Sequence, residues 1–250
     1  MPLRVGFDLD GTVADMYSAL QREAEKLFGK EQISKPAPKI PAKTSTVAAK
    51  PSAKPAADGE APKPEDATTN LAMDELHLTA RQQMQLWDHV KRIENFWTTL
   101  PELEPGIIKR IAKAARERKW EVIFLTTRPS TAGELTQLQS QRWLDKHGFQ
   151  YPSVYVVQGS RGKIAEALGL DIFVDDRPEN CLDIAVESKA KVVLIWNGPL
   201  KDVPPGAKRL GVKAVNTITD ALAIVEQLDD YKNAPSMMRA IKKMIGRAEE

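Results

Sequence analysis

The stretch VGFDLDGTVAD, residues 5–15, decides the fold, because an apolar run of strand length ends there in two aspartates, Asp8 and Asp10. A carboxylate at the end of a buried strand is costly unless it has a partner or a function. Apolar residues at helical spacing over 15–28 predict a helix directly afterwards, which argues against an Asp-Gly hairpin. The glycine and glutamate positions of an EF-hand loop are not matched either. The stretch therefore predicts the first strand and helix of an α/β unit.

Beyond Pro101 the sequence alternates short apolar runs with helical patterns. This alternation is typical of βα units and predicts a parallel sheet, so we assign the chain to the α/β class. We expect strands at EVIFLTT (121–127), SVYVV (153–157), DIFVDD (171–176) and KVVLIW (191–196). We expect a helix over 130–148 to open with a capping box formed by Thr131 and Glu134.

The α/β core is interrupted by an insertion. We assign residues 1–27 and 101–229 to the core and residues 28–100 to a small cap inserted after the first strand and helix. Within the cap, residues 34–66 are rich in proline, alanine and lysine, which predicts a disordered linker. Residues 230–250 form a predicted tail helix whose methionine and isoleucine side favours protein packing or a homodimer over membrane contact.

Bulk composition excludes several classes of protein. The 250 residues are 42% hydrophobic and carry a formal net charge of +2, so nothing global favours nucleic acid or a membrane surface as partner. No apolar run approaches the roughly 20 residues of a membrane-spanning helix. A single cysteine, Cys181, cannot form an intramolecular disulfide, and no secretory signal precedes the first strand. We expect a cytoplasmic protein.

Polar side chains follow three of the predicted strands where each strand ends. They are Asp8 and Asp10 after the first, Thr126 and Thr127 after the second, and Asp175 and Asp176 after DIFV, with Lys163 nearby in a helix capped by Ser160. Carboxyl ends of parallel strands meet at one edge of the sheet, so these groups should converge. Close carboxylates repel by roughly 1 to 4 kcal/mol per pair, which calls for a cation. Oxygen ligands without histidine or thiol indicate Mg²⁺, and Mg²⁺ with Lys163 and Thr126 suggests phosphoryl chemistry.

Each of these residues also has an ordinary structural explanation. The aspartates at 175 and 176 suit the entry to a helix, Thr126 and Thr127 suit a strand, and Lys163 suits a solvated helix surface. The combination, with every group at a strand end or beside one, favours a site.

These motifs together resemble the haloacid dehalogenase (HAD) superfamily of phosphohydrolases. DLDGT is similar to its first motif, Thr126 to its second, Lys163 to its third and FVDD to its fourth. The resemblance implies a Rossmann-like parallel sheet sandwiched by helices. It also implies that Asp8 is a nucleophile that forms an aspartyl-phosphate and that Asp10 is the general acid and base. Mg²⁺ would be held by Asp8, the main-chain carbonyl of Asp10, and Asp175 or, as we favour, Asp176.

FWTTLPELEPG, FLTTRP and FVDDRPE are similar to the 5′(3′)-deoxyribonucleotidase branch of that superfamily, which implies a nucleoside monophosphate as substrate. In that branch cap aromatics stack on the base, so Phe96 and Trp97 either do so or pack the cap. Arg128 stands where the branch has a proline, and we take it as a substrate-pocket candidate. Three alternatives remain open: a polynucleotide end phosphatase, a sugar-phosphate phosphatase, and a catalytically silent interaction protein.

Overall fold

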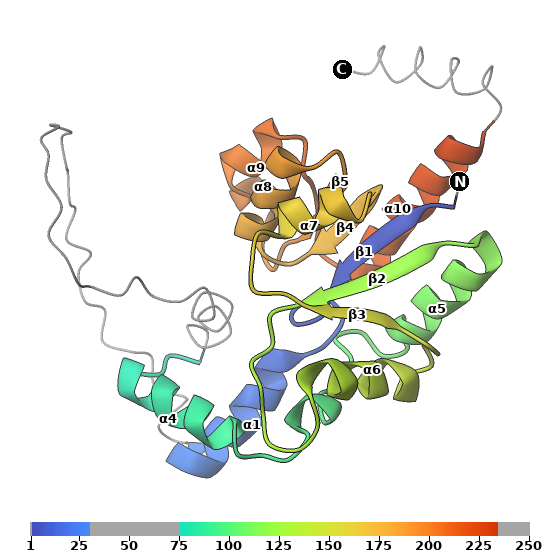
Figure 1. Ribbon diagram of the computed structural model, residues 1–250. Helices are drawn as coiled ribbons and strands as arrows, with labels where there is room; N and C mark the ends of the chain where they lie inside the picture. Colours follow the sequence, from blue (N-terminus) through green and yellow to red (C-terminus); the bar gives the residue numbers. More distant parts are fainter. Residues whose placement is uncertain (1, 31–75, 235–250) are drawn as a thin grey trace, which may run out of the picture.

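A parallel six-stranded sheet forms the centre of the protein in the computed structural model, which describes residues 2–30 and 76–234 (Figure 1). The sheet has the strand order β3-β2-β1-β4-β5-β6. The strands are β1 (Arg4–Asp8), β2 (Glu121–Thr126), β3 (Ser153–Val156), β4 (Ile172–Asp175), β5 (Lys191–Ile195) and β6 (Lys213–Val215). All five neighbouring pairs are parallel, which confirms the predicted α/β class.

Helices cover the sheet on both faces. One apolar core joins the sheet to α1 (Met16–Phe28), α5 (Ile107–Arg118), α6 (Thr136–Lys146) and α10 (Ile218–Asn233), and a second joins it to α7 (Arg161–Ala167), α8 (Pro178–Glu187) and α9 (Pro205–Arg209). A short 3₁₀ turn, η2 (Leu200–Asp202), precedes α9. Among the described residues, no helix is long and apolar enough to cross a membrane.

Strand alternation assigns side chains to the two cores. Phe7 and Val174 contribute to the core on the α5 side, whereas Phe173 contributes to the core on the α7 side. Because successive strand residues face opposite ways, Asp8 and Asp175 lie on the same face of the sheet as Phe173. Phe7 pairs with Val174 in the register, so Asp8 and Asp175 come next to each other where β1 and β4 end.

The described part of the predicted cap consists of α4 (Ala80–Val90) and the 3₁₀ turn η1 (Phe96–Thr98). Helix α4 lies beside α1, beyond the carboxyl end of β1, and His89 Nε2 lies 3.0 Å from Glu23 Oε2 across the pair (Figure 1). The predicted linker, residues 34–66, lies outside the described residues. Helix α10 continues to Asn233, so the first residues of the predicted tail belong to it, and residues 235–250 are not described.

The capping box predicted at Thr131 and Glu134 is wrong. Helix α6 begins at Thr136, and Thr131 Oγ1 instead donates to Gln139 Oε1 at 3.2 Å. The backbone N–H of Glu134 donates to Asn95 Oδ1 at 2.9 Å, which ties this loop to the inserted segment. A tertiary contact has therefore taken the place of the expected helical turn.

We expect Gly6→Ala to destabilise the protein, because strand β1 passes tightly over the α7-side core. A Cβ at Gly6 would lie 2.9 Å from Leu170 Cδ1 and closer to the ring of Phe173. Overpacking of this kind costs about 1 to 3 kcal/mol, measurable as a lower free energy of unfolding in urea. Gly206→Ala is the matched control, because its Cβ meets only Leu182 Cδ2 at 3.8 Å. Equal stability of the two variants would contradict this account of the packing.

Candidate active site

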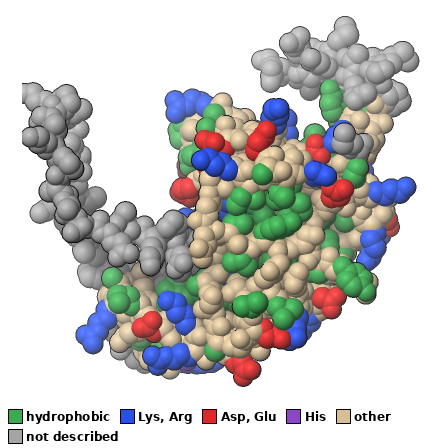
Figure 2. Space-filling model, viewed as in Figure 1, with side chains coloured by type: hydrophobic (Ala, Val, Ile, Leu, Met, Phe, Trp, Pro, Cys, Tyr) green, Lys and Arg blue, Asp and Glu red, His purple; other side chains and the backbone are tan. Residues whose placement is uncertain are grey.

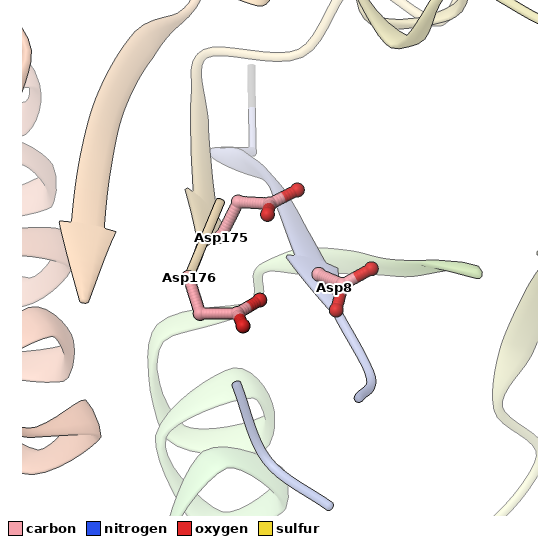
Figure 3. Close-up of side chains that lie close together, drawn as sticks. All are labelled: Asp8, Asp175 and Asp176. Carbon is pink, nitrogen blue, oxygen red and sulfur yellow. The ribbon is translucent and has the colours of Figure 1, made fainter. Parts of the chain in front are cut away.

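Three carboxylates gather where β1 and β4 end. Asp8, Asp175 and Asp176 each offer an oxygen, and these oxygens lie within 4.8 Å of one another (Figure 3). Asp8 and Asp175 are buried, whereas Asp176 is half-buried. The structure thus brings together three of the aspartates selected from the sequence.

Arg161 lies against two of these carboxylates. Its Nη2 is 2.7 Å from Asp8 Oδ1, its Nη1 donates to Asp175 Oδ2 at 3.1 Å, and its side chain is only 3% exposed. Burial alone would lower the pKa of Arg161, but the two aspartates outweigh it and the net shift is upward. One guanidinium therefore compensates part of the charge of the cluster.

Lys163, the cation predicted for this position, does not take it. Its side chain is exposed on α7, and no ion pair among the described residues involves it. Ser160 does cap the helix as expected, with Oγ accepting from the backbone N–H of Lys163 at 3.1 Å. Arg161 is the residue that the sequence analysis missed. Two positions along a helix turn a side chain by about 200°, and the sequence gives no fixed orientation for so short a helix.

Asp175 and Asp176 differ in how many hydrogen bonds their carboxylate oxygens accept. Asp175 accepts from Arg161, from the backbone N–H of Arg177 at 2.9 Å and from Asn180 Nδ2 at 3.1 Å. The hydrogen bond described for the Asp176 carboxylate is a long one, 3.3 Å from Thr12 Oγ1. Asp176 therefore has more capacity left for a further ligand than Asp175.

The carboxylates have unusual pKa values. Burial raises the pKa of Asp8 to about 7, with Arg161 opposing the rise and Asp175 and Asp10 adding to it. Burial also raises the pKa of Asp176 well above its usual range, and the neighbouring charges of Asp175 and Asp8 act in the same direction. The pKa of Asp175 is raised by burial against the opposing effect of Arg161. Loss of hydration is the largest cause of all three shifts, so the site disfavours the ionised form of these carboxyl groups.

Asp10 and Thr126 form the neighbouring part of the site. Thr126 is buried, and its Oγ1 donates to Asp10 Oδ2 at 3.3 Å. Thr127 is half-buried beside it. Thr126 was predicted to lie close to the aspartates, and it lies close to Asp10 because it ends β2, the strand next to β1.

The sequence predicted that Arg128 would belong to the substrate pocket, but the structure closes this position to a substrate. Its side chain has no exposed surface, and its Nη2 lies 2.7 Å from Asp10 Oδ1. Arg128 donates to Ser140 of α6 as well, so its side chain lies inside the protein and not toward solvent. It is a buried partner of Asp10 and is not among the residues that line the cavity at Asp10 and Asp176.

Phe96 and Trp97 pack the protein interior. Phe96 is 2% exposed and Trp97 is fully buried, so neither ring presents a face to a bound base. The two rings meet edge to face with centroids 5.1 Å apart, and Trp97 Nε1 donates to the carbonyl of Pro129 at 2.9 Å. The base-stacking alternative is therefore wrong for these residues as the structure places them.

A cavity of about 420 Å³ opens at the aspartates. Asp10, Gly11 and Asp176 line it, together with the aromatic side chains of Tyr17 and Trp196. Its remaining lining residues include Glu104, Arg177, Asn197, Asn216 and Thr217. The volume lies within the range of small-molecule sites, and the mix of aromatic and amide side chains suits an organic group attached to a phosphate.

The donors of the cluster fit a magnesium ion. Asp8 and Asp176 offer oxygen atoms close together, no histidine or cysteine belongs to the three-residue cluster, and burial raises the pKa of both aspartates, so a cation would stabilise their ionised forms. Mg²⁺ prefers oxygen ligands of this kind. Asp175 fits less well as a direct ligand, because protein donors already occupy its oxygens.

Two solved structures with a similar fold are described as a phosphatase and a hydrolase. A predicted phosphatase from Clostridium acetobutylicum superposes with a TM-score of 0.52 at 13% identity, over 91% of this chain and 99% of its own. A HAD family hydrolase from Deinococcus radiodurans R1, with bound phosphate and sodium, gives 0.51 at 13% identity, over 90% and 96%. No family model matches the sequence, and no curated protein matches it. The chain therefore has the HAD-like fold.

We expect Gly11→Ala to weaken Mg²⁺ binding, because its Cβ would occupy the space of the Asp176 carboxylate. The added atom would lie 2.7 Å from Asp176 Cγ, at a backbone φ of +84°. Displacing an ion ligand should cost roughly 10- to 100-fold in affinity, measured by calorimetric titration with MgCl₂. Gly106→Ala is the control, since Gly106 has a φ of +78° with nothing within 4 Å. If both variants bound Mg²⁺ like the wild type, Asp176 would not be a ligand.

The stability of the metal-free protein should depend on pH through Asp8. Its pKa rises from an ordinary 3.8 to about 7 on folding, so its contribution is complete below about pH 4 and is lost as the pH rises through about 7. In EDTA, the free energy of unfolding of wild type relative to Asp8→Asn should fall over this interval. Added Mg²⁺ should reverse the trend, because the ion binds the ionised carboxylates. A difference independent of pH, measured by urea unfolding, would show that Asp8 is not buried as described.

Proposed function

We propose that this protein is a phosphomonoester hydrolase that works through an aspartyl-phosphate on Asp8. The observation that carries this proposal is the grouping of Asp8 with Asp176 and Arg161 beside the Asp10–Thr126 pair, with Asp10 and Asp176 lining one cavity. This combination holds a nucleophile, cationic and hydroxyl groups for a phosphate, and a carboxylate for proton transfer.

In the first step, an Asp8 carboxylate oxygen forms a bond to phosphorus while the bond from phosphorus to the ester oxygen breaks. Asp10, which lines the cavity, gives a proton to the departing oxygen. In the second step Asp10 takes a proton from water as the water oxygen attacks the phosphorus, which releases phosphate and restores Asp8. Proton transfer of this kind contributes typically 10²- to 10⁴-fold.

The side chains around Asp8 would neutralise part of the negative charge of the bound phosphate. We assign the equatorial phosphate oxygens to Arg161, which lies against Asp8, and to the Thr126 hydroxyl, which donates to Asp10. Mg²⁺ held by Asp8, the Asp10 carbonyl and Asp176 would supply Lewis-acid neutralisation of the anionic phosphate. In this proposal Arg161 is the phosphate-binding cation, the role that the family resemblance assigned to Lys163.

We infer that the substrate is a nucleoside monophosphate, most simply a deoxyribonucleotide. The cavity supports this choice because two aromatic side chains, Tyr17 and Trp196, line it together with Asp10 and Asp176. Asn216 Nδ2 donates to the carbonyls of Trp196 and Gly198, both at 2.8 Å, so its amide oxygen is the group it can offer to a base N–H.

Other substrates are less well supported. A polynucleotide end phosphatase would need a basic groove, and the face shown in Figure 2 has lysine, arginine and acidic side chains interspersed. A sugar phosphate would use the same chemistry without needing the aromatic walls. A silent interaction protein has no use for three buried or half-buried carboxylates, which are costly to keep together.

The test is phosphate release from a panel of nucleoside monophosphates, sugar phosphates and a 3′-phosphorylated oligonucleotide in MgCl₂. Wild type should turn over a nucleotide best, and EDTA should abolish activity. Asp8→Asn should reduce kcat by at least about 10⁴-fold, because an amide cannot act as the nucleophile. Turnover that survives Asp8→Asn would refute the mechanism, whereas a strong preference for sugar phosphates would refute only the substrate assignment.

Tyr17→Ala and Trp196→Ala are the matched variants for the substrate. Both should raise KM for the nucleotide while leaving hydrolysis of the small substrate acetyl phosphate unchanged, because acetyl phosphate has no base for these rings to contact. A parallel loss on both substrates would argue against a base-binding role for these two side chains.

A further inference from the structure

Arg128 and Asp10 form a buried ion pair directly behind the cavity. Arg128 Nε donates to Asp10 Oδ2 at 2.8 Å and to Oδ1 at 3.0 Å, and Nη2 donates to Oδ1 at 2.7 Å. The Arg128 side chain is fully buried, whereas the Asp10 side chain keeps 10% of its surface exposed and lines the cavity. The guanidinium therefore holds the carboxylate from the side that faces away from the cavity.

The guanidinium is itself fixed on its other edges. Nη1 donates to Ser140 Oγ at 3.0 Å, and Ser140 Oγ in turn donates to the carbonyl of Thr136 at 2.8 Å on α6. The guanidinium carbon lies 4.9 Å from the Trp97 ring centroid and 5.8 Å from that of Trp143. A guanidinium that lies over two tryptophan rings and is bonded on two edges is restricted in its orientation.

The rings that hold Arg128 are also fixed. Trp97 Nε1 donates to the carbonyl of Pro129, and Trp143 Nε1 donates to the carbonyl of Leu100 at 2.7 Å. Trp97 comes from η1, in the segment inserted between β1 and β2, so the insertion reaches Asp10 through Arg128. Packed and hydrogen-bonded side chains therefore connect the inserted segment to Asp10.

We propose that Arg128 is a positioning residue for Asp10: its buried fork fixes the plane of the Asp10 carboxylate so that one edge points at the leaving oxygen of the substrate. This inference rests on the proposed function, because it assumes that Asp10 transfers the proton. A side chain free to rotate would present the wrong edge for part of the time, and misplacement by about 1 Å can cost 10²-fold in rate. Ion pairing alone does not require a fork, but fixing a plane does.

The experiment compares two phosphate esters in MgCl₂. An alkyl phosphate needs its leaving oxygen protonated, whereas p-nitrophenyl phosphate has a leaving group that departs as the anion. Arg128→Ala should lower kcat/KM roughly 10²-fold for the alkyl ester and much less for the nitrophenyl ester. Millimolar guanidinium chloride should restore part of the lost activity in a saturable way, and equal concentrations of urea or sodium chloride should not.

Arg118→Ala is the matched control. Arg118 also lies close to two carboxylates, Asp229 and Asp230, and over a tryptophan ring, Trp120, at 6.0 Å, but at the end of α5 that precedes β2. This variant should keep the wild-type ratio of activities on the two esters and show no response to guanidinium. Arg128→Lys should also lose activity selectively on the alkyl ester, because it keeps the charge of Arg128 but not its forked guanidinium. It replaces Arg128→Ala as the test variant if Arg128→Ala does not fold.

Several outcomes would overturn the inference. A folded Arg128 variant that loses both esters equally without guanidinium rescue would show that Arg128 only supports the structure. A folded variant with wild-type activity on the alkyl ester would show that Asp10 needs no such support. Wild-type protein inactive on both esters would instead refute the proposed function, and the inference with it.

Discussion

The structure depends on the electrostatic balance among aspartates at the carboxyl edge of the sheet. Asp8, Asp175 and Asp176 have oxygens within 4.8 Å of one another, and Asp10 follows two residues after Asp8. Arg161 compensates Asp8 and Asp175, and no ion pair in the described part of the chain involves Asp176. Burial and the charges of Asp175 and Asp8 raise the pKa of Asp176 more than Arg161 lowers it, so a bound cation would stabilise the ionised carboxylate.

Two arginines reach this edge from opposite faces of the sheet. Arg161 comes from α7 and meets Asp8 and Asp175, whose side chains point to that face. Arg128 follows β2, is bonded to Ser140 of α6, and meets Asp10. Asp8 and Asp10 therefore have separate cationic partners, which allows one ion pair to be changed without the other.

The inserted segment also contributes to the site, although not through direct contact with a ligand. Trp97 is buried under Arg128, and α4 packs beside α1. The cavity is lined instead by Tyr17 at the start of α1 and by Trp196 after β5. If this cavity receives the organic part of the substrate, core loops and the first helix decide specificity more than the aromatic residues of η1 do.

The sequence by itself determined the parallel α/β sheet and the convergence of Asp8, Asp176 and Thr126. Strand periodicity is local, and parallel strands necessarily bring their carboxyl ends to one edge. Only the tertiary structure decided that Arg161 and not Lys163 faces the aspartates, and that Arg128, Phe96 and Trp97 are buried. The orientation of a short helix and the packing of a loop depend on neighbours distant in the chain, and no local pattern of residues encodes them.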